Sequence, residues 1–83
     1  MEEEIGKIMH FYNKIGVAAI ELTGELKVGD TLHVKSDSTD FTFTVESMQI
    51  EHESVTEAGA GDQVGIRVPE TVHENDKLFK VVE

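Results

Sequence analysis

Short runs of alternating apolar and polar residues follow one another along the whole chain. The clearest lies at FTFTVE, where Phe41, Phe43 and Val45 alternate with polar residues. A period of two places the two sets of side chains on opposite faces of a β-strand. Similar runs occur at VAAIEL, TLHVK, QVGIRV and LFKVV. The pattern predicts strands over residues 5–13, 17–22, 31–35, 41–50, 63–68 and 78–82.

The apolar face of each strand is expected to point into one core. After Val45 the apolar phase moves from odd to even positions, because Met48 and Ile50 follow it. A β-bulge near Glu46 and Ser47 would produce such a shift and bend the strand. The residues expected to share the core are Leu32, Phe41, Phe43, Val45, Val64 and Ile66.

Polar turns separate the predicted strands. Three of them end in aspartate, at VGD, GAGD and HEND, so Asp30, Asp62 and Asp76 are each expected to launch a strand. GELKVGD and the acidic segment EHESVTE are expected to be loops. No convincing amphipathic helix is present. We therefore predict one all-β domain over residues 1–83, a small Greek-key β-barrel of six or seven strands.

The charge balance restricts the partners. The chain has 17 acidic and 7 basic residues and a formal charge of −10, which disfavours RNA and DNA because phosphate backbones need clustered cations. It has no cysteine, so disulfides are excluded. The start, MEEEIGKIMHF, lacks the positive segment of a signal peptide, and no apolar run approaches the ~20 residues of a membrane span. The expectation is a cytoplasmic protein without membrane contact.

Catalytic and metal-binding patterns are weak. GELKVGDT differs from a phosphate-binding loop because Asp30 stands at the lysine position. The four histidines lack metal-ligand spacing, although Glu51 and Glu53 flank His52. No G-x-S-x-G elbow occurs. We therefore expect no catalytic residues, no cofactor and no metal site.

A binding surface is the remaining hypothesis. The least acidic outward positions are expected to form it: His10, Tyr12, Lys14, His33, Lys35 and Arg67. The alternative is that these are ordinary solvated positions of half-exposed strands.

Two family resemblances rest on longer stretches. GELKVGDTLHV and EAGAGDQVGIRV resemble the second domain of translational GTPases such as elongation factor Tu, although Thr23 stands where those proteins usually carry an arginine. From Phe41 onward, the chain is similar to the C-terminal barrel of the collagenase-like peptidases, whose members include RNA-hydroxylation proteins. Both resemblances imply a barrel of the translation-protein type. Both also imply that the chemistry belongs to a larger catalytic domain outside this stretch.

Three hypotheses for function follow. The first is a stand-alone, non-catalytic module that binds a protein. The second is an RNA- or tRNA-binding accessory module, which the acidic charge and Thr23 disfavour. The third is a detached accessory domain of a collagenase-like peptidase system. The oligomeric state stays open.

Overall fold

The computed structural model describes residues 2–37 and 39–82, and these form strands and turns without a helix. No helix in this part of the chain could therefore cross a membrane. The all-β class predicted from the alternation is confirmed. The ten strands are β1 (Glu2–Tyr12), β2 (Val17–Leu22), β3 (Leu26–Lys27), β4 (Thr31–Lys35), β5 (Asp40–Thr44), β6 (Met48–Ile50), β7 (Glu53–Val55), β8 (Glu57–Ala58), β9 (Gln63–Arg67) and β10 (Lys77–Val81).

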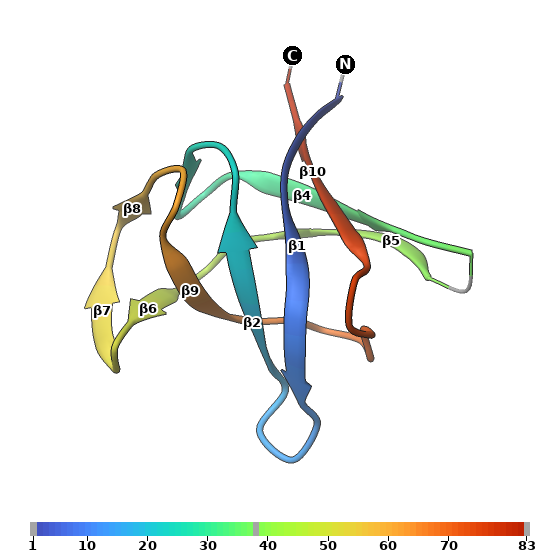
Figure 1. The fold of residues 1–83 in the computed structure, drawn as a ribbon, viewed down its shortest axis with the longest axis horizontal. Coiled ribbons are helices and arrows are strands. Elements are labelled where there is room, and N and C mark those ends of the chain that lie inside the picture. The colour runs from blue at the N-terminus through green and yellow to red at the C-terminus, as the bar shows by residue number, and fades with distance from the viewer. Residues whose placement is uncertain (1, 38, 83) are drawn as a thin grey trace.

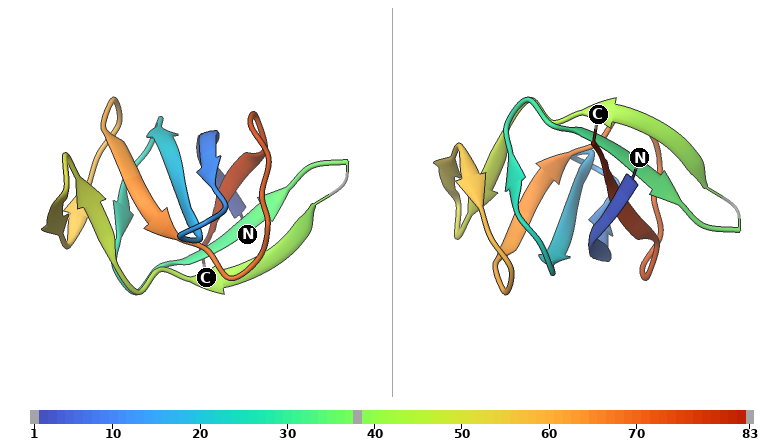
Figure 2. Two further views of the ribbon diagram at one scale, coloured as in Figure 1. Left: turned by 90° about the horizontal axis from the view of Figure 1, so that it is seen from below. Right: turned by 90° about the horizontal axis from the view of Figure 1, so that it is seen from above.

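Eight strands form one antiparallel sheet in the order β5-β4-β10-β1-β2-β9-β6-β7, and β3 pairs with β8 separately. The sheet curls around the core into a barrel-like shape (Figures 1 and 2). The last strand, β10, lies between β1 and β4, which gives the non-local pairing typical of a Greek key. Because Glu2 pairs with Val81, the two ends of the described chain lie side by side (Figure 1).

The structure has ten strands in its described part, more than the six or seven predicted. Four of them, β3, β6, β7 and β8, have only two or three residues. β3 lies inside the segment predicted as a loop, where Leu26 is fully buried. The acidic segment EHESVTE also contains strand, since it forms part of the β6–β7 hairpin and the start of β8. Such short elements cannot display a period, and their pairing defines them: β3 pairs with β8, and β6 pairs with β7 and β9.

The predicted bulge near residues 46–47 is wrong. β5 ends at Thr44 and β6 begins at Met48, so the chain leaves one edge of the sheet and pairs with β9 near the other. The Val45 backbone N–H donates to the Asp30 carbonyl at 2.9 Å, which holds this crossing segment. The phase shift therefore marks a change of strand. Register shifts occur instead in β1. Its pairing with β10 shifts between Glu4 and Gly6, and its pairing with β2 shifts between Ile8 and His10.

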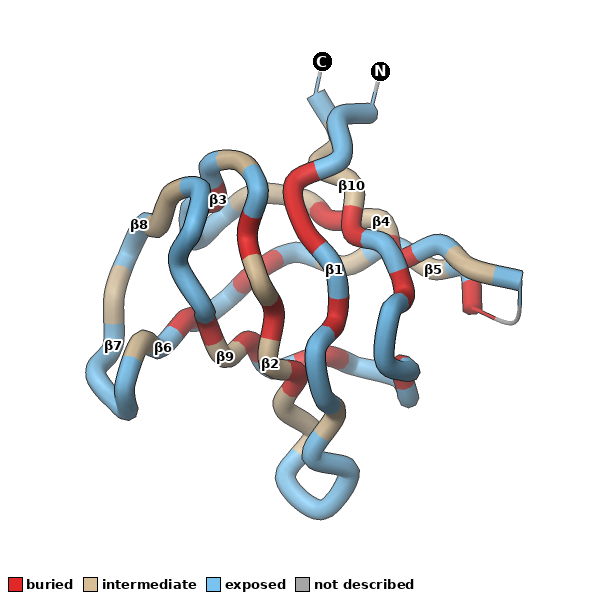
Figure 3. The backbone as a smooth tube through the Cα atoms, viewed as in Figure 1, coloured by how far each residue is buried: buried red, intermediate tan, exposed pale blue. Residues whose placement is uncertain are grey.

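The buried residues form one hydrophobic core, and buried positions alternate with more exposed ones along β1 and β2 (Figure 3). The predicted core positions Leu32, Val45, Val64 and Ile66 are buried. Phe41 and Phe43 pack against this core but stay half-buried, because they lie on the edge strand β5. Most of the largest fully buried side chains belong to strands inside the eight-stranded sheet, among them Ile5, Ile8, Ile20, Leu22, Leu32 and Leu78.

The three predicted aspartate turns share one hydrogen-bond pattern. Each aspartate donates its N–H to the carbonyl of the residue three positions earlier and accepts that residue's N–H on its carboxylate. The third residue of each turn has a positive φ, which glycine and asparagine adopt most easily. The pairs are Lys27–Asp30, Gly59–Asp62 and His73–Asp76, with Gly29, Gly61 and Asn75 in the third position.

Candidate binding surface

The outer face of β1, β2, β9 and β6 carries two cross-strand rows that define the candidate surface. Tyr12 pairs with Val17, and Val17 pairs with Arg67 on the far side of β2. The adjacent row runs from His10 through Ala19 and Gly65 to Gln49. Directly opposed residues of an antiparallel sheet share a face, so these side chains project from the same surface.

A shallow groove of about 540 Å³ lies over the second row. We call it the outer groove and define it by Tyr12, Ile15, Val17, Ala19, Gln49 and Gly65. The small residues Ala19 and Gly65 form its floor, where longer side chains would fill the space. Ile15 is 61% exposed and Tyr12 is 50% exposed at its edge. The sheet therefore presents an apolar hollow to solvent.

Tight turns of unusual backbone conformation border the outer groove. Gly16 has φ of 67° in the β1–β2 turn and allows Ile15 to project beside the groove. Glu51 and His52, at the β6–β7 turn, have φ of 49° and 67°. Two successive positive φ values suit the tight right-handed twist of a hairpin, but they are costly for residues other than glycine. Both side chains line the rim.

The predicted surface residues do not all come together. His10 and Tyr12 contact each other edge to face, with ring centroids 4.5 Å apart, and Lys14 follows in the next turn. Arg67 reaches the same face through the row that contains Val17. In contrast, His33 and Lys35 lie on β4, which β10 separates from β1. The six residues therefore belong to two regions of the sheet.

Sequence reasoning missed the residues that shape the outer groove. Ala19 and Gly65 could have indicated the groove. The alternation already placed Ala19 outward and Gly65 between two inward residues. Small residues on an outward face leave a depression when they are paired across strands. That pairing could not be derived from the local pattern.

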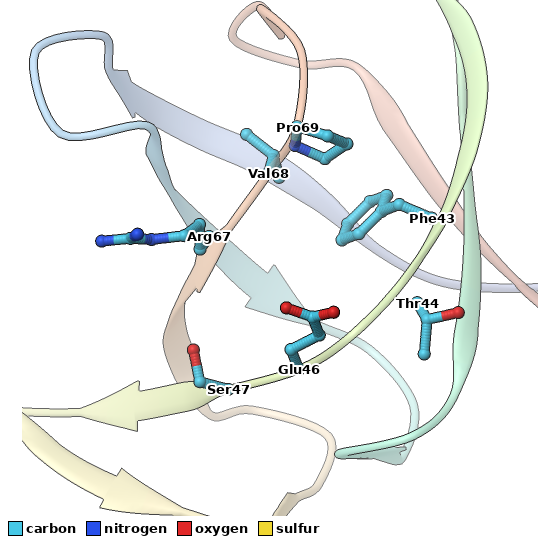
Figure 4. Close-up of a pocket in the computed structure, with 7 residues that line it drawn as sticks. All are labelled: Phe43, Thr44, Glu46, Ser47, Arg67, Val68 and Pro69. Carbon is cyan, nitrogen blue, oxygen red and sulfur yellow. The ribbon is translucent and has the colours of Figure 1, made fainter.

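A second hollow, of about 420 Å³, lies where the chain crosses from β5 to β6 (Figure 4). Phe43, Val68 and Pro69 supply its apolar side, and Glu46 and Ser47 its polar side. The Arg67 guanidinium points away from Phe43 and Pro69 (Figure 4). The described lining contains a carboxylate and two hydroxyl groups but no histidine that could act as a base toward them.

His33 is held between two carboxylates. Its Nδ1 lies 2.5 Å from Glu2 Oε2, and its Nε2 is hydrogen-bonded to Asp40 Oδ1. The hydrogen bond to Asp40 raises the pKa of His33 most, and the bond to Glu2 raises it further. A histidine whose two ring nitrogens both donate is protonated. The cluster therefore ties β1 to β4 and β5 across the outer face of β10.

We predict that this cluster makes stability depend on pH. Because folding raises the pKa of His33, its contribution is fully present below the ordinary histidine pKa of about 6.5 and is lost as pH rises through the folded-state value. The thermal midpoint of the native chain should therefore exceed that of His33→Gln most at about pH 6. The difference should shrink toward about pH 9 in melts followed by circular dichroism. A difference independent of pH would show that the ring is neutral in the fold.

Metal binding has little support in the described part of the chain. No three side chains among its histidines, aspartates and glutamates are grouped so that they could hold an ion. His52 and its neighbours Glu51 and Glu53 lie at a hairpin turn without forming such a group.

No protein-family model matches the chain. It is 40% identical over 81 residues to an uncharacterized protease of Methanocaldococcus jannaschii, a match that takes in 96% of the chain and 20% of that protein. A collagenase of Porphyromonas gingivalis is 32% identical over 78 residues, which are 92% of the chain and 22% of the collagenase. The chain thus spans about a fifth of the length of these relatives.

The fold also has a close counterpart among solved structures. The C-terminal domain of a Geobacillus thermoleovorans protein described as a U32 peptidase superposes with a TM-score of 0.90 at 17% identity, covering 96% of the chain and 93% of that domain. The likeness to peptidases therefore extends over nearly the whole chain and is not confined to the part after Phe41. These matches support the collagenase-like resemblance and not the elongation-factor one. The chain is therefore similar to one segment of a protease and of a collagenase, and it has the fold of the C-terminal domain of a protein described as a U32 peptidase.

Proposed function

We propose that this chain is an accessory domain of the collagenase-like peptidase type, and that it binds a protein partner through the outer groove without performing catalysis. The observation that carries the proposal is the match itself. Nearly the whole chain corresponds to about a fifth of two proteins named as a protease and a collagenase. The partner is the type of protein that forms the remaining four fifths or so of those relatives.

The shape of the outer groove supports docking of a protein. Its floor is made by backbone and small side chains, which lets another surface approach the sheet closely. Tyr12 combines a large apolar ring with a hydroxyl group, a side chain that is enriched at protein interfaces. Gln49 adds amide hydrogen bonding at the other side of the groove. This combination of apolar centre and polar border is typical of a binding site.

The arrangement of reactive groups supports binding over catalysis. Core side chains fill the interior of the described sheet, so both hollows are surface features. His33 has both ring nitrogens engaged by carboxylates and is unsuited to take a proton from a substrate. The carboxylates Glu2 and Asp40 are correspondingly occupied by the ring.

The test measures binding to the Methanocaldococcus jannaschii protease produced without the segment that this chain matches. Ala19→Glu places a long charged side chain on the floor of the outer groove, and we expect it to weaken binding at least tenfold, or about 1.4 kcal/mol. Thr44→Glu adds the same charge at an exposed position of β5, in the second hollow, and should change the affinity less than twofold. Isothermal titration calorimetry gives both affinities, and circular dichroism verifies that each variant is folded.

The relative effects of the two substitutions show which of the two hollows binds the partner. A larger loss with Thr44→Glu than with Ala19→Glu would assign docking to the second hollow and overturn the role of the outer groove. No binding of the native chain at concentrations of about 0.1 mM would contradict docking to this type of partner.

A further inference from the structure

Three lysines form a single row across the outer face of neighbouring strands. Lys7 on β1 is directly opposite Lys77 on β10, and Lys77 is directly opposite Lys35 on β4. All three are exposed. They are three of the seven basic residues in a chain with a formal charge of −10. We call this arrangement the lysine row.

The lysine row forms no ion pair within the described chain. Glu21 is opposite Lys7 and Asp40 is opposite Lys35, yet neither forms an ion pair with the lysine. The Asp40 carboxylate is bonded to His33 instead. Lys77 has a lysine on both sides, and like charges directly opposite each other destabilise a sheet. The fold thus keeps Lys77 between two like charges although acidic residues are abundant in the chain.

We propose that the lysine row binds an acidic helix of a protein partner, with carboxylates at positions i, i+3 or i+4, and i+7. Adjacent strands lie about 4.8 Å apart, so the row spans about 10 Å. Seven residues of α-helix rise about 10.5 Å, and residues at this spacing share one helix face. Three carboxylates on such a face match the three ammonium groups in spacing and charge.

The surroundings of the lysine row favour this occupant over RNA. Glu21 lies beyond one end of the row and Asp40 beyond the other, so the cationic surface stops after three strands. A phosphate backbone that continued past either end would meet a carboxylate. The neighbouring outward row places Phe79 between Glu4 and His33, and Phe79 is half-buried. It offers an apolar contact beside the lysines, which suits an amphipathic helix.

The test compares two synthetic helical peptides of identical composition at low salt. One has three glutamates on a single face at the proposed spacing, and the other distributes them around the helix. We expect the first to bind at least tenfold more tightly in titrations followed by the amide resonances of the ¹⁵N-labelled chain. Lys77→Gln should weaken this binding at least tenfold. Lys14→Gln removes an exposed lysine outside the row and should change it less than twofold.

A second readout distinguishes a binding row from a structural one. Because Lys77 is flanked by like charges, Lys77→Gln should raise the thermal midpoint while it weakens peptide binding. Equal affinity for the two peptides, or no binding of either, would overturn the proposal. A single-stranded RNA of equal charge that bound more tightly than the facial peptide and shifted the amides of β10 would replace it with a nucleic-acid site.

Discussion

Replacing Ile20 by alanine is expected to destabilise the fold by about 2 to 5 kcal/mol. Ile20 is fully buried at the middle of β2, where it lies opposite Ile8 on one side and Val64 on the other. Truncation removes apolar contact and leaves a cavity that rigid sheet neighbours cannot fill. Since small domains have about 5 to 15 kcal/mol of stability, the loss is a large share of the total. Urea denaturation measures it directly.

The matched control for Ile20 is Thr42→Ala, which truncates an exposed side chain on the edge strand β5. Its effect should stay within about 0.5 kcal/mol. A loss below about 1 kcal/mol for Ile20→Ala would show that the centre of the core is not at β2.

Replacing Gly6 by alanine is expected to cost about 1 to 3 kcal/mol, through crowding and not through lost contacts. A Cβ atom at this position would lie 2.5 Å from the backbone carbonyl oxygen of Glu21 and 3.3 Å from Ile20 Cγ2. The oxygen belongs to β2, which is paired on both sides and cannot move away without disturbing two ladders. The midpoint of urea denaturation should fall accordingly.

Gly59 provides the control for Gly6. Nothing lies within 4 Å of a Cβ built at Gly59, and Gly59→Ala should therefore leave the stability within about 0.5 kcal/mol. Equal effects of the two substitutions would contradict the close approach of the β1 and β2 backbones at Gly6.

The sequence pattern predicted the larger strands because their alternation is local. VAAIEL has its inward positions at Ala18, Ile20 and Leu22, and these are buried in the fold. The three aspartate turns were equally predictable, since the turn chemistry of aspartate, glycine and asparagine acts over four residues. The register shift of β1 against β10 and the pairing of β3 with β8 were not predictable, because they depend on pairing partners far along the chain.

In the candidate sites too, the local pattern predicted which residues point outward but not which distant residues they meet. His10 and Tyr12 were predicted as outward residues and are outward in the fold, and Tyr12 lines the outer groove. His33 was predicted as part of a free surface, but Glu2, 31 residues away, binds one side of its ring. The lysine row was missed because no local feature indicates that β10 inserts between β1 and β4. Only this topology brings Lys7, Lys35 and Lys77 together.

Docking through the outer groove can be tested most directly at Tyr12. It is the only tyrosine of the chain, so incorporation of 3-fluorotyrosine gives a single ¹⁹F resonance from the edge of the groove. Addition of the Methanocaldococcus jannaschii protease without its matched segment should shift or broaden this resonance to saturation. Ala19→Glu should suppress the change, and Thr44→Glu should not. A ¹⁹F resonance that stays unchanged while calorimetry shows the two proteins bound would contradict docking through the outer groove.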